Sequence, residues 1–143
     1  MKNTKHRIAV VGGGVQGLSL LDILLTSGHD VTLFESKDRV GGVWNNFGRV
    51  PYMSLQLSSR HFRFPVHPHN KDLDMPEAEY IREYIQSFIA KKDLARYFRC
   101  NVEIKNVLPL SDTEYSLYDT SDKEIEGKFN FVIYTGTASI PKI

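Results

Sequence analysis

The sequence predicts an α/β fold: a central parallel sheet with helices on both faces and a small β meander beside it. Three observations carry this prediction. They are a short apolar run that ends in glycines, a stretch of helical periodicity after it, and a β-rich segment after the helix. A strand, a helix and a strand with short connections favour two parallel neighbours joined by a right-handed crossover. The length of 143 residues suits one domain of ordinary size.

The first strand and the first helix are expected near the N-terminus. Ile8–Val11 is a continuous apolar run followed by three glycines, which is typical of a strand buried on both faces. A helical pattern then ends at Ser27-Gly28, where glycine can adopt the left-handed conformation of a helix C-terminus. Asp30–Glu35 is rich in β-formers and predicts the second strand. The apolar residues of the helical pattern lie three and four positions apart: Val15, Leu18, Leu21, Leu24 and Leu25.

The second half of the chain predicts a long loop, another helix and the meander. Residues 36–75 contain several helix-breaking glycines and prolines, and a loop of this length in a compact domain is usually functional. A helix is expected from Pro76, which suits the first helical position, to Lys91-Lys92. Three β-like segments separated by turn residues predict the meander: Val102–Val107, Glu114–Tyr118 and Phe129–Tyr134.

A glycine motif lies between the first strand and the first helix. Gly12-x-Gly14-x-x-Gly17 has the spacing of a Rossmann-like dinucleotide fingerprint. In that pattern Gly12 makes the tight turn, Gly14 lets the backbone approach a pyrophosphate, and Gly17 allows the helix to pack on the strand. The unpaired N–H groups at the start of the helix, near Val15 and Gln16, attract phosphates.

Glu35 lies at the end of the second strand, where the fingerprint requires a carboxylate. A carboxylate there accepts hydrogen bonds from ribose hydroxyls and repels a 2′-phosphate, which argues against NADP at this site. The motif by itself fits NAD or FAD. The alternative without a ligand is a glycine-rich turn between strand and helix, with an exposed glutamate nearby.

The run Gly41-Gly42-Val43-Trp44 follows the acid, and its two glycines allow a second stretch of backbone to approach the same ligand. Together with the glycine motif and Glu35, this run resembles the FAD-binding half of flavin-containing monooxygenases. The resemblance implies that Gly42, Val43 and Trp44 line the flavin cofactor. The alternative for Trp44 is an aromatic side chain that covers the edge of the core.

The resemblance continues over nearly the whole chain. Gln56 falls where the family carries Asn or Gln beside the flavin, although a polar loop residue is the alternative. Ile104 falls on the strand whose backbone meets the adenine in the family. Phe129–Tyr134 with Thr135-Gly136 after it resembles the segment that closes the family's first FAD half.

Two motifs of the family are missing from the sequence. No second GxGxxG for NADPH follows the first, and the substrate-side motif of Phe-x-Gly followed by His is absent. We therefore expect residues 1–143 to be the N-terminal half of an FAD-binding domain, without the NADPH-binding domain and the C-terminal FAD segment. Such a chain is either truncated or one part of a split enzyme that a second chain completes.

The resemblance implies an FAD-dependent oxygenation of nucleophilic N or S centres or of carbonyl compounds. NADPH is then a co-substrate with no site in this chain, and the chain alone is expected to lack turnover. Two alternatives stay open: a non-catalytic FAD-binding module, and the NAD-binding domain of another oxidoreductase. No residue is assigned as catalytic.

Composition argues against several other classes. The formal net charge of +1 gives no electrostatic footprint for nucleic acid, and no apolar run reaches the roughly 18 residues of a membrane span. The single cysteine, Cys100, cannot form an internal disulfide, which favours a cytoplasmic location. His67 and His69 with Asp72 and Asp74 have metal-ligand residue types. A proline between the histidines makes a loop the simpler interpretation, so no metal site is expected.

Overall fold

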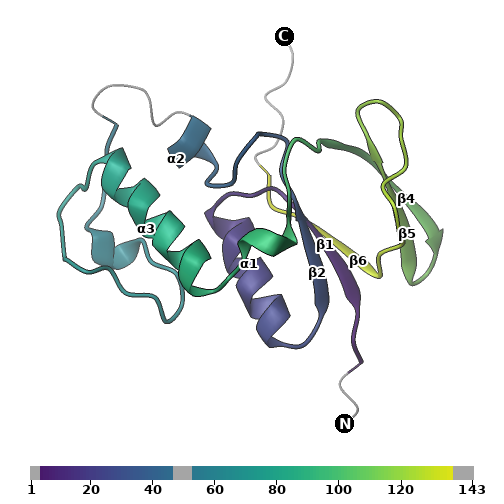
Figure 1. Cartoon of the computed structure of the whole chain (residues 1–143), viewed down its shortest axis with the longest axis horizontal. Helices are drawn as coiled ribbons and strands as arrows, with labels where there is room; N and C mark the ends of the chain where they lie inside the picture. The colour runs from purple at the N-terminus through teal and green to yellow at the C-terminus, as the bar shows by residue number, and fades with distance from the viewer. Residues whose placement is uncertain (1–3, 47–52, 137–143) are drawn as a thin grey trace.

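The computed structural model describes residues 4–46 and 53–136, and a four-stranded parallel sheet forms its centre (Figure 1). Strand β1 (Arg7–Val11) pairs with β2 (Asp30–Phe34) on one side and with β6 (Phe131–Tyr134) on the other. The short strand β3 (Phe98–Arg99) extends the sheet beyond β2. Helix α1 (Val15–Thr26) connects β1 to β2, so the predicted strand–helix–strand unit is confirmed.

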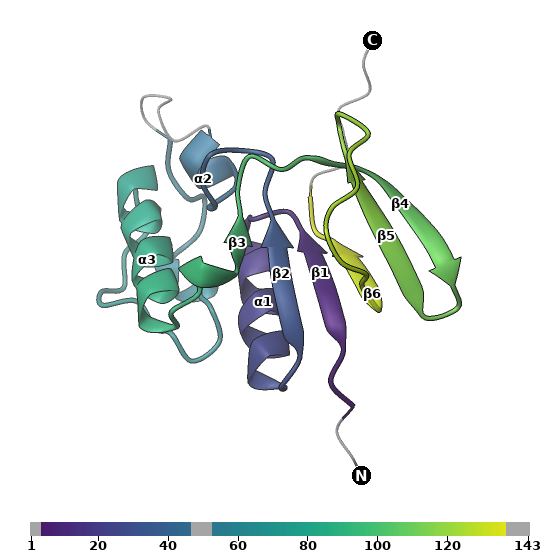
Figure 2. The ribbon, with the colours of Figure 1, turned by 45° about the vertical axis from the view of Figure 1, so that its right-hand side comes forward.

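Helices cover one face of the sheet. Figure 2 shows α1 against the sheet and α3 (Ala78–Lys91) on the side of β3. Both helices bury their apolar stripes in one core with the side chains of β1 and β2 that point to this face. Each fully buried side chain of this kind stabilises the fold by about 1.5–3 kcal/mol. The core includes Ile8, Val10, Leu18, Leu21, Val31, Leu33, Ile81, Ile85 and Phe88.

An antiparallel hairpin covers the other face. Strands β4 (Ile104–Ser111) and β5 (Glu114–Asp119) form it, and Leu117 of β5 packs with Phe129 in a second core. That core also contains the side chains of β1 and β2 on this face: Ala9, Val11 and Phe34. The predicted α/β class with a parallel sheet is confirmed. The expected helices on both faces are not found in the described residues, because the hairpin supplies the apolar cover that this face requires.

The third segment of the predicted meander divides between two pairings. Phe129 exchanges backbone hydrogen bonds with Tyr115 of the hairpin, at N···O distances of 3.0 and 2.8 Å. The chain then turns, and Phe131–Tyr134 joins the parallel sheet as β6 instead of extending the hairpin. The first β-like segment also differs, since β4 begins at Ile104 and continues through Pro109. A proline is tolerated there because β4 lies at a sheet edge.

The long loop contains short elements that periodicity could not reveal. Helix α2 (Val43–Asn46) directly follows Gly41-Gly42, and a single 3₁₀ turn spans Ser59–His61. Helix α3 begins at Ala78 with Glu77 as its N-cap, so the expectation that Pro76 is the first helical residue is wrong. Backbone hydrogen bonds to residues 53 and 55 hold residues 76 and 77 extended, and the helix begins at the next residue. Within the two described ranges, no helix is both long and apolar enough to cross a membrane.

Candidate functional site

The glycine turn after β1 contains glycines that the fold requires and one that it does not. Gly12 has φ +112°, and a Cβ on it would lie 2.8 Å from the backbone N of Gly136. A Cβ on Gly17 would lie 1.9 Å from the carbonyl oxygen of Gly12, which explains the close packing of α1 on the strand. A Cβ on Gly14 would meet no atom nearer than 3.9 Å. Packing therefore leaves the space in front of Gly14 open.

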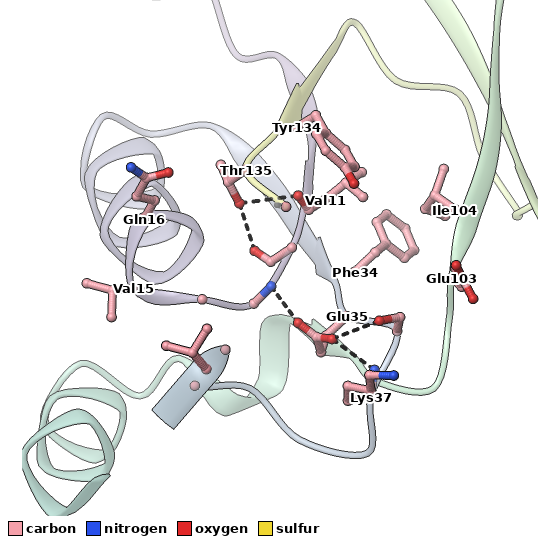
Figure 3. A pocket seen from close by; sticks show the side chains of 18 of the residues that line it. Val11, Val15, Gln16, Phe34, Glu35, Lys37, Glu103, Ile104, Tyr134 and Thr135 are labelled. Carbon is pink, nitrogen blue, oxygen red and sulfur yellow. Dashed lines mark hydrogen bonds between the residues drawn. The ribbon is translucent and has the colours of Figure 1, made fainter. Parts of the chain in front are cut away.

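The Glu35 carboxylate lies directly against this turn (Figure 3). Its Oε2 accepts the N–H of Gly13 at 2.7 Å, and its Oε1 accepts the N–H of Lys37 at 2.8 Å and the hydroxyl of Ser36 at 3.1 Å. The side chain is 7% exposed. A carboxylate offers about four acceptor positions. One position on Oε2 therefore remains for a hydroxyl group of a ligand.

The pair Gly41-Gly42 faces the glycine turn that follows β1. The N–H of Gly41 donates to the carbonyl of Gly13 at 2.7 Å. Gly42 has φ +58°, and a Cβ on it would lie 3.0 Å from the Cα of Gly14. The following helix α2 is held by Arg82 of α3, which donates to the carbonyl of Trp44 at 3.3 Å. Two stretches of backbone without side chains therefore border the same space, as the sequence predicted.

Between these segments lies a cleft of about 630 Å³ at the carboxyl ends of β1 and β2. Ligands of open α/β sheets bind at this end of the strands, and the volume is in the range of small-molecule sites. The lining also includes large apolar and aromatic side chains: Phe34, Phe62, Val102 and Tyr134. Nine of the residues predicted from the sequence border the cleft: Gly12, Gly14, Val15, Gln16, Glu35, Gly42, Val43, Trp44 and Ile104.

The N-terminus of α1 opens into the cleft. The first helical hydrogen bond runs from the N–H of Leu18 to the carbonyl of Gly14 at 3.0 Å. No side chain caps the helix, and no acidic residue lies in its first turn. The N–H groups of Val15 and Gln16 therefore have no helical partner and carry the positive end of the helix dipole, a combination that binds phosphate.

Some residues differ in position from the sequence-based expectation, and others had been missed. Gly17 lies behind the turn and not on the cleft, in the packing role predicted for it. Gln56 is exposed and does not border the cleft, so its place beside a flavin stays a prediction. Gly13 and Thr135 carry hydrogen bonds that shape the site. The run of three glycines was a signal for Gly13, whereas nothing in the sequence singled out the Thr135 hydroxyl.

Neither the cysteine nor the histidine pair provides a reactive group at the cleft. Burial, followed by the negative charges of Glu35 and Asp38, raises the pKa of the Cys100 thiol, which keeps it protonated near neutral pH. His67 contacts Ser87, and His69 contacts the carbonyl of Phe62. No group of three or more potential ligands among residues 4–46 and 53–136 could hold a metal ion.

Two proteins of named activity are similar to this chain in sequence. Flavin-containing monooxygenase 5 of Homo sapiens is 30% identical over 146 residues, which cover 93% of this chain and 27% of the human protein. The thiol-specific monooxygenase of Saccharomyces cerevisiae is 28% identical over 160 residues, which cover 99% of this chain and 36% of the yeast protein. The chain thus spans about a third or less of the length of these relatives.

Two solved structures have the same fold. The S-allyl-L-cysteine S-oxygenase from Allium sativum superposes with a TM-score of 0.77 at 17% identity, over 92% of this chain and 36% of that protein. OTEMO in an FAD-bound form superposes with a TM-score of 0.81 at 19% identity, over 96% of this chain and 26% of that protein. A sequence profile of the flavin-binding monooxygenase-like family matches residues 5–136. The chain therefore belongs to the flavin-binding monooxygenase-like family.

Proposed function

We propose that this chain binds FAD and that the adenosine-diphosphate half of the cofactor lies in the cleft. The observation that carries the proposal is the Glu35 carboxylate, which is held against the glycine turn by the N–H of Gly13 at 2.7 Å with one acceptor position to spare. Family membership favours FAD over NAD as the dinucleotide. The negative charge of Glu35 disfavours a ribose 2′-phosphate.

Each part of the ligand has matching residues along the cleft. Glu35 would accept hydrogen bonds from the ribose, and Gly12 and Gly14 with the N-terminus of α1 would hold the pyrophosphate. Ile104 would lie against the adenine. Gly42, Val43 and Trp44 would line the part of the cofactor that leads to the flavin, and Gln56 stays a candidate for its far end. The open space at Gly14 supports this arrangement, since packing does not account for a glycine there.

We further propose that residues 1–143 are the N-terminal half of the FAD-binding domain of a cytoplasmic, NADPH-dependent monooxygenase. Additional sequence or a second chain would supply the NADPH-binding domain. Bound FAD supplies the oxygen chemistry, and this chain orients the cofactor. Relatives include a thiol-specific monooxygenase, and cyclohexanone monooxygenase shares the fold. These names favour nucleophilic N or S centres or carbonyl compounds as substrates.

Fluorescence titration of the 143-residue chain with FAD and with FMN tests the cofactor assignment. FAD is expected to bind at least tenfold more tightly than FMN, because FMN lacks the adenosine half. Glu35→Arg should weaken FAD binding by at least tenfold, through loss of charge-assisted ribose hydrogen bonds. Glu83→Arg makes the same charge change on the exposed face of α3 and should leave the affinity unchanged. Equal affinities for FAD and FMN, or an unaffected Glu35→Arg variant, would refute the assignment.

A second measurement separates a catalytic chain from a binding module. With FAD bound, the chain alone is expected to oxidise NADPH no faster than free FAD does. A rate clearly above that background would show that the chain carries its own NADPH chemistry, contrary to the proposal that this part lies elsewhere.

A further inference from the structure

The peptide group between Gly12 and Gly13 is held from both sides, by Glu35 and by Thr135, which Figure 3 labels. On one side the Gly13 N–H donates to Oε2 of Glu35 at 2.7 Å. On the other side the Gly12 carbonyl accepts the hydroxyl of Thr135 at an O···O distance of 3.0 Å. A trans peptide is planar, with its N–H and C=O pointing in opposite directions. The two partners therefore fix the orientation of one rigid plane between them.

The backbone of Thr135 is anchored independently of its side chain. Its N–H donates to the carbonyl of Val11 at 2.8 Å, which continues the pairing of β6 with β1. The hydroxyl lies 3.2 Å from this Val11 carbonyl and 3.0 Å from the Gly12 carbonyl. A hydroxyl has one proton to donate. The Gly12 carbonyl is the nearer of the two acceptors, and the Val11 carbonyl already accepts the Thr135 N–H, so the hydroxyl is better placed to donate to Gly12.

Close packing surrounds this carbonyl. A Cβ on Gly17 would lie 1.9 Å from the Gly12 oxygen, so the α1 backbone covers it on one side. A Cβ on Gly12 or on Gly17 would also lie within about 3 Å of the Thr135 hydroxyl, at 2.9 and 3.0 Å. In Thr135→Val a methyl group would fill the space of the hydroxyl, so a water could not take the place of the lost donor there. Removal of the hydroxyl would leave the carbonyl without this part-buried hydrogen bond, at a cost of about 1 kcal/mol, or about fivefold in an equilibrium constant.

We propose that Thr135 is a positioning residue for the nucleotide site, acting through the Gly12–Gly13 peptide on the carboxylate of Glu35. The hydroxyl keeps the Gly13 N–H directed at Glu35, and this hydrogen bond keeps the carboxylate turned toward the cleft. Its effect on a ligand rests on the proposed function, whereas its effect on the peptide does not. The residue that directly follows β6 thereby positions the turn that follows β1.

Three variants of the 143-residue chain test the role of Thr135. Thr135→Val removes the hydroxyl at nearly constant volume, and Thr135→Ser restores it. Thr32→Val is the matched control on β2, away from the turn. The first readout is hydrogen exchange of the Gly13 amide in the ligand-free protein, followed by NMR. Thr135→Val should raise the exchange rate of the Gly13 amide about fivefold over the wild type, after correction for any change in global stability. In Thr135→Ser and Thr32→Val this rate should stay within about twofold of the wild type.

The second readout is the affinity for FAD. Thr135→Val should weaken it about five- to tenfold, with recovery in Thr135→Ser. In a Glu35→Ala background, Thr135→Val should change the affinity by less than twofold, because the residue through which it acts is gone. Unchanged Gly13 exchange in Thr135→Val, or a Ser variant no better than the Val variant, overturns the proposal. If the wild type fails to bind FAD, the proposed function fails, and the Gly13 exchange still decides the role of Thr135.

Discussion

At the scale of single residues, glycines of one motif are present for different physical reasons. Gly17 is fixed by the protein itself, because the backbone of Gly12 occupies the place of a Cβ. Gly14 has an ordinary φ of −76° and open space in front of it, so neither strain nor packing demands a glycine there. Beside the modest preference of helix N-caps for glycine, a ligand that approaches the backbone closely is the physical reason for a glycine at this position.

Gly14→Ala should therefore separate binding from stability. We expect it to weaken FAD binding at least tenfold, because the new methyl group occupies the approach of the pyrophosphate. The free energy of unfolding should fall by less than about 1 kcal/mol, the scale of replacing an N-cap glycine. Gly17→Ala is the matched comparison and should lower that free energy by roughly 1–3 kcal/mol, since backbone must move. FAD titration and urea unfolding check both. An unchanged affinity in Gly14→Ala would contradict the pyrophosphate assignment.

At the scale of elements, helix α3 holds the long loop through its own Tyr84 and through His67 of the loop. The Tyr84 hydroxyl donates to the carbonyl of His67 at 2.6 Å and accepts the N–H of Phe64 at 2.7 Å, so it clamps the turn between them. His67 is buried and contacts Ser87 of the same helix. Val66, between these residues, has φ +51°, a strained conformation for a β-branched side chain. The clamp holds this strained turn in place.

The free energy of unfolding of the protein should depend on pH through His67. Burial, and then the positive charges of Lys91, His69 and Lys92, lower the pKa of His67 in the folded protein. Below the unfolded pKa of about 6.5, the unfolded chain binds a proton that the folded chain does not. Stability is therefore complete above that pH and falls as the pH drops below it.

His67→Gln should flatten this decline between pH 7 and pH 5, measured as the free energy of unfolding in urea. His61→Gln, at an exposed position of the same loop, is the control and should keep the wild-type slope. An equally steep decline in His67→Gln would show that other groups cause it.

At the scale of the whole molecule, both faces of the sheet are covered, and β6 forms one of its edges among residues 4–46 and 53–136. In the described part of the chain, β6 is the last strand on its side of the sheet. Its side chains Phe131 and Tyr134 are 49% and 64% exposed. An edge strand with exposed aromatic side chains is a template for pairing with another chain. The molecule should therefore associate through this edge when nothing else covers it.

Phe131→Lys should reduce this association, because a charged side chain on an edge strand opposes pairing. We expect the protein concentration at which light scattering rises to increase several-fold. Ile23→Lys on α1 is the matched control, since Ile23 is exposed to a similar degree, 46%, and lies away from the edge. An equal gain in both variants would mean that added charge alone, and not the edge, controls association.

The sequence predicted the elements whose signals are local. The apolar run before the glycines, the periodicity of α1 and the β-rich segment ending at Glu35 each depend on neighbouring residues, so β1, α1 and β2 could be predicted closely. Strand β3 and helix α2 were missed because two and four residues carry no periodicity. The pairing of Phe131–Tyr134 was missed because the choice between hairpin and sheet depends on distant partners.

The sequence by itself determined which residues could meet a dinucleotide, since glycine spacing and a strand-end acid are patterns in the chain. Only the tertiary structure decided how these residues are held. It joined Gly13 to Glu35, Gly41 to Gly13 and Thr135 to Gly12, all across long separations in the chain. Such hydrogen bonds exist only when the parallel sheet brings strand ends together at one edge. Their energies therefore leave no trace in local composition.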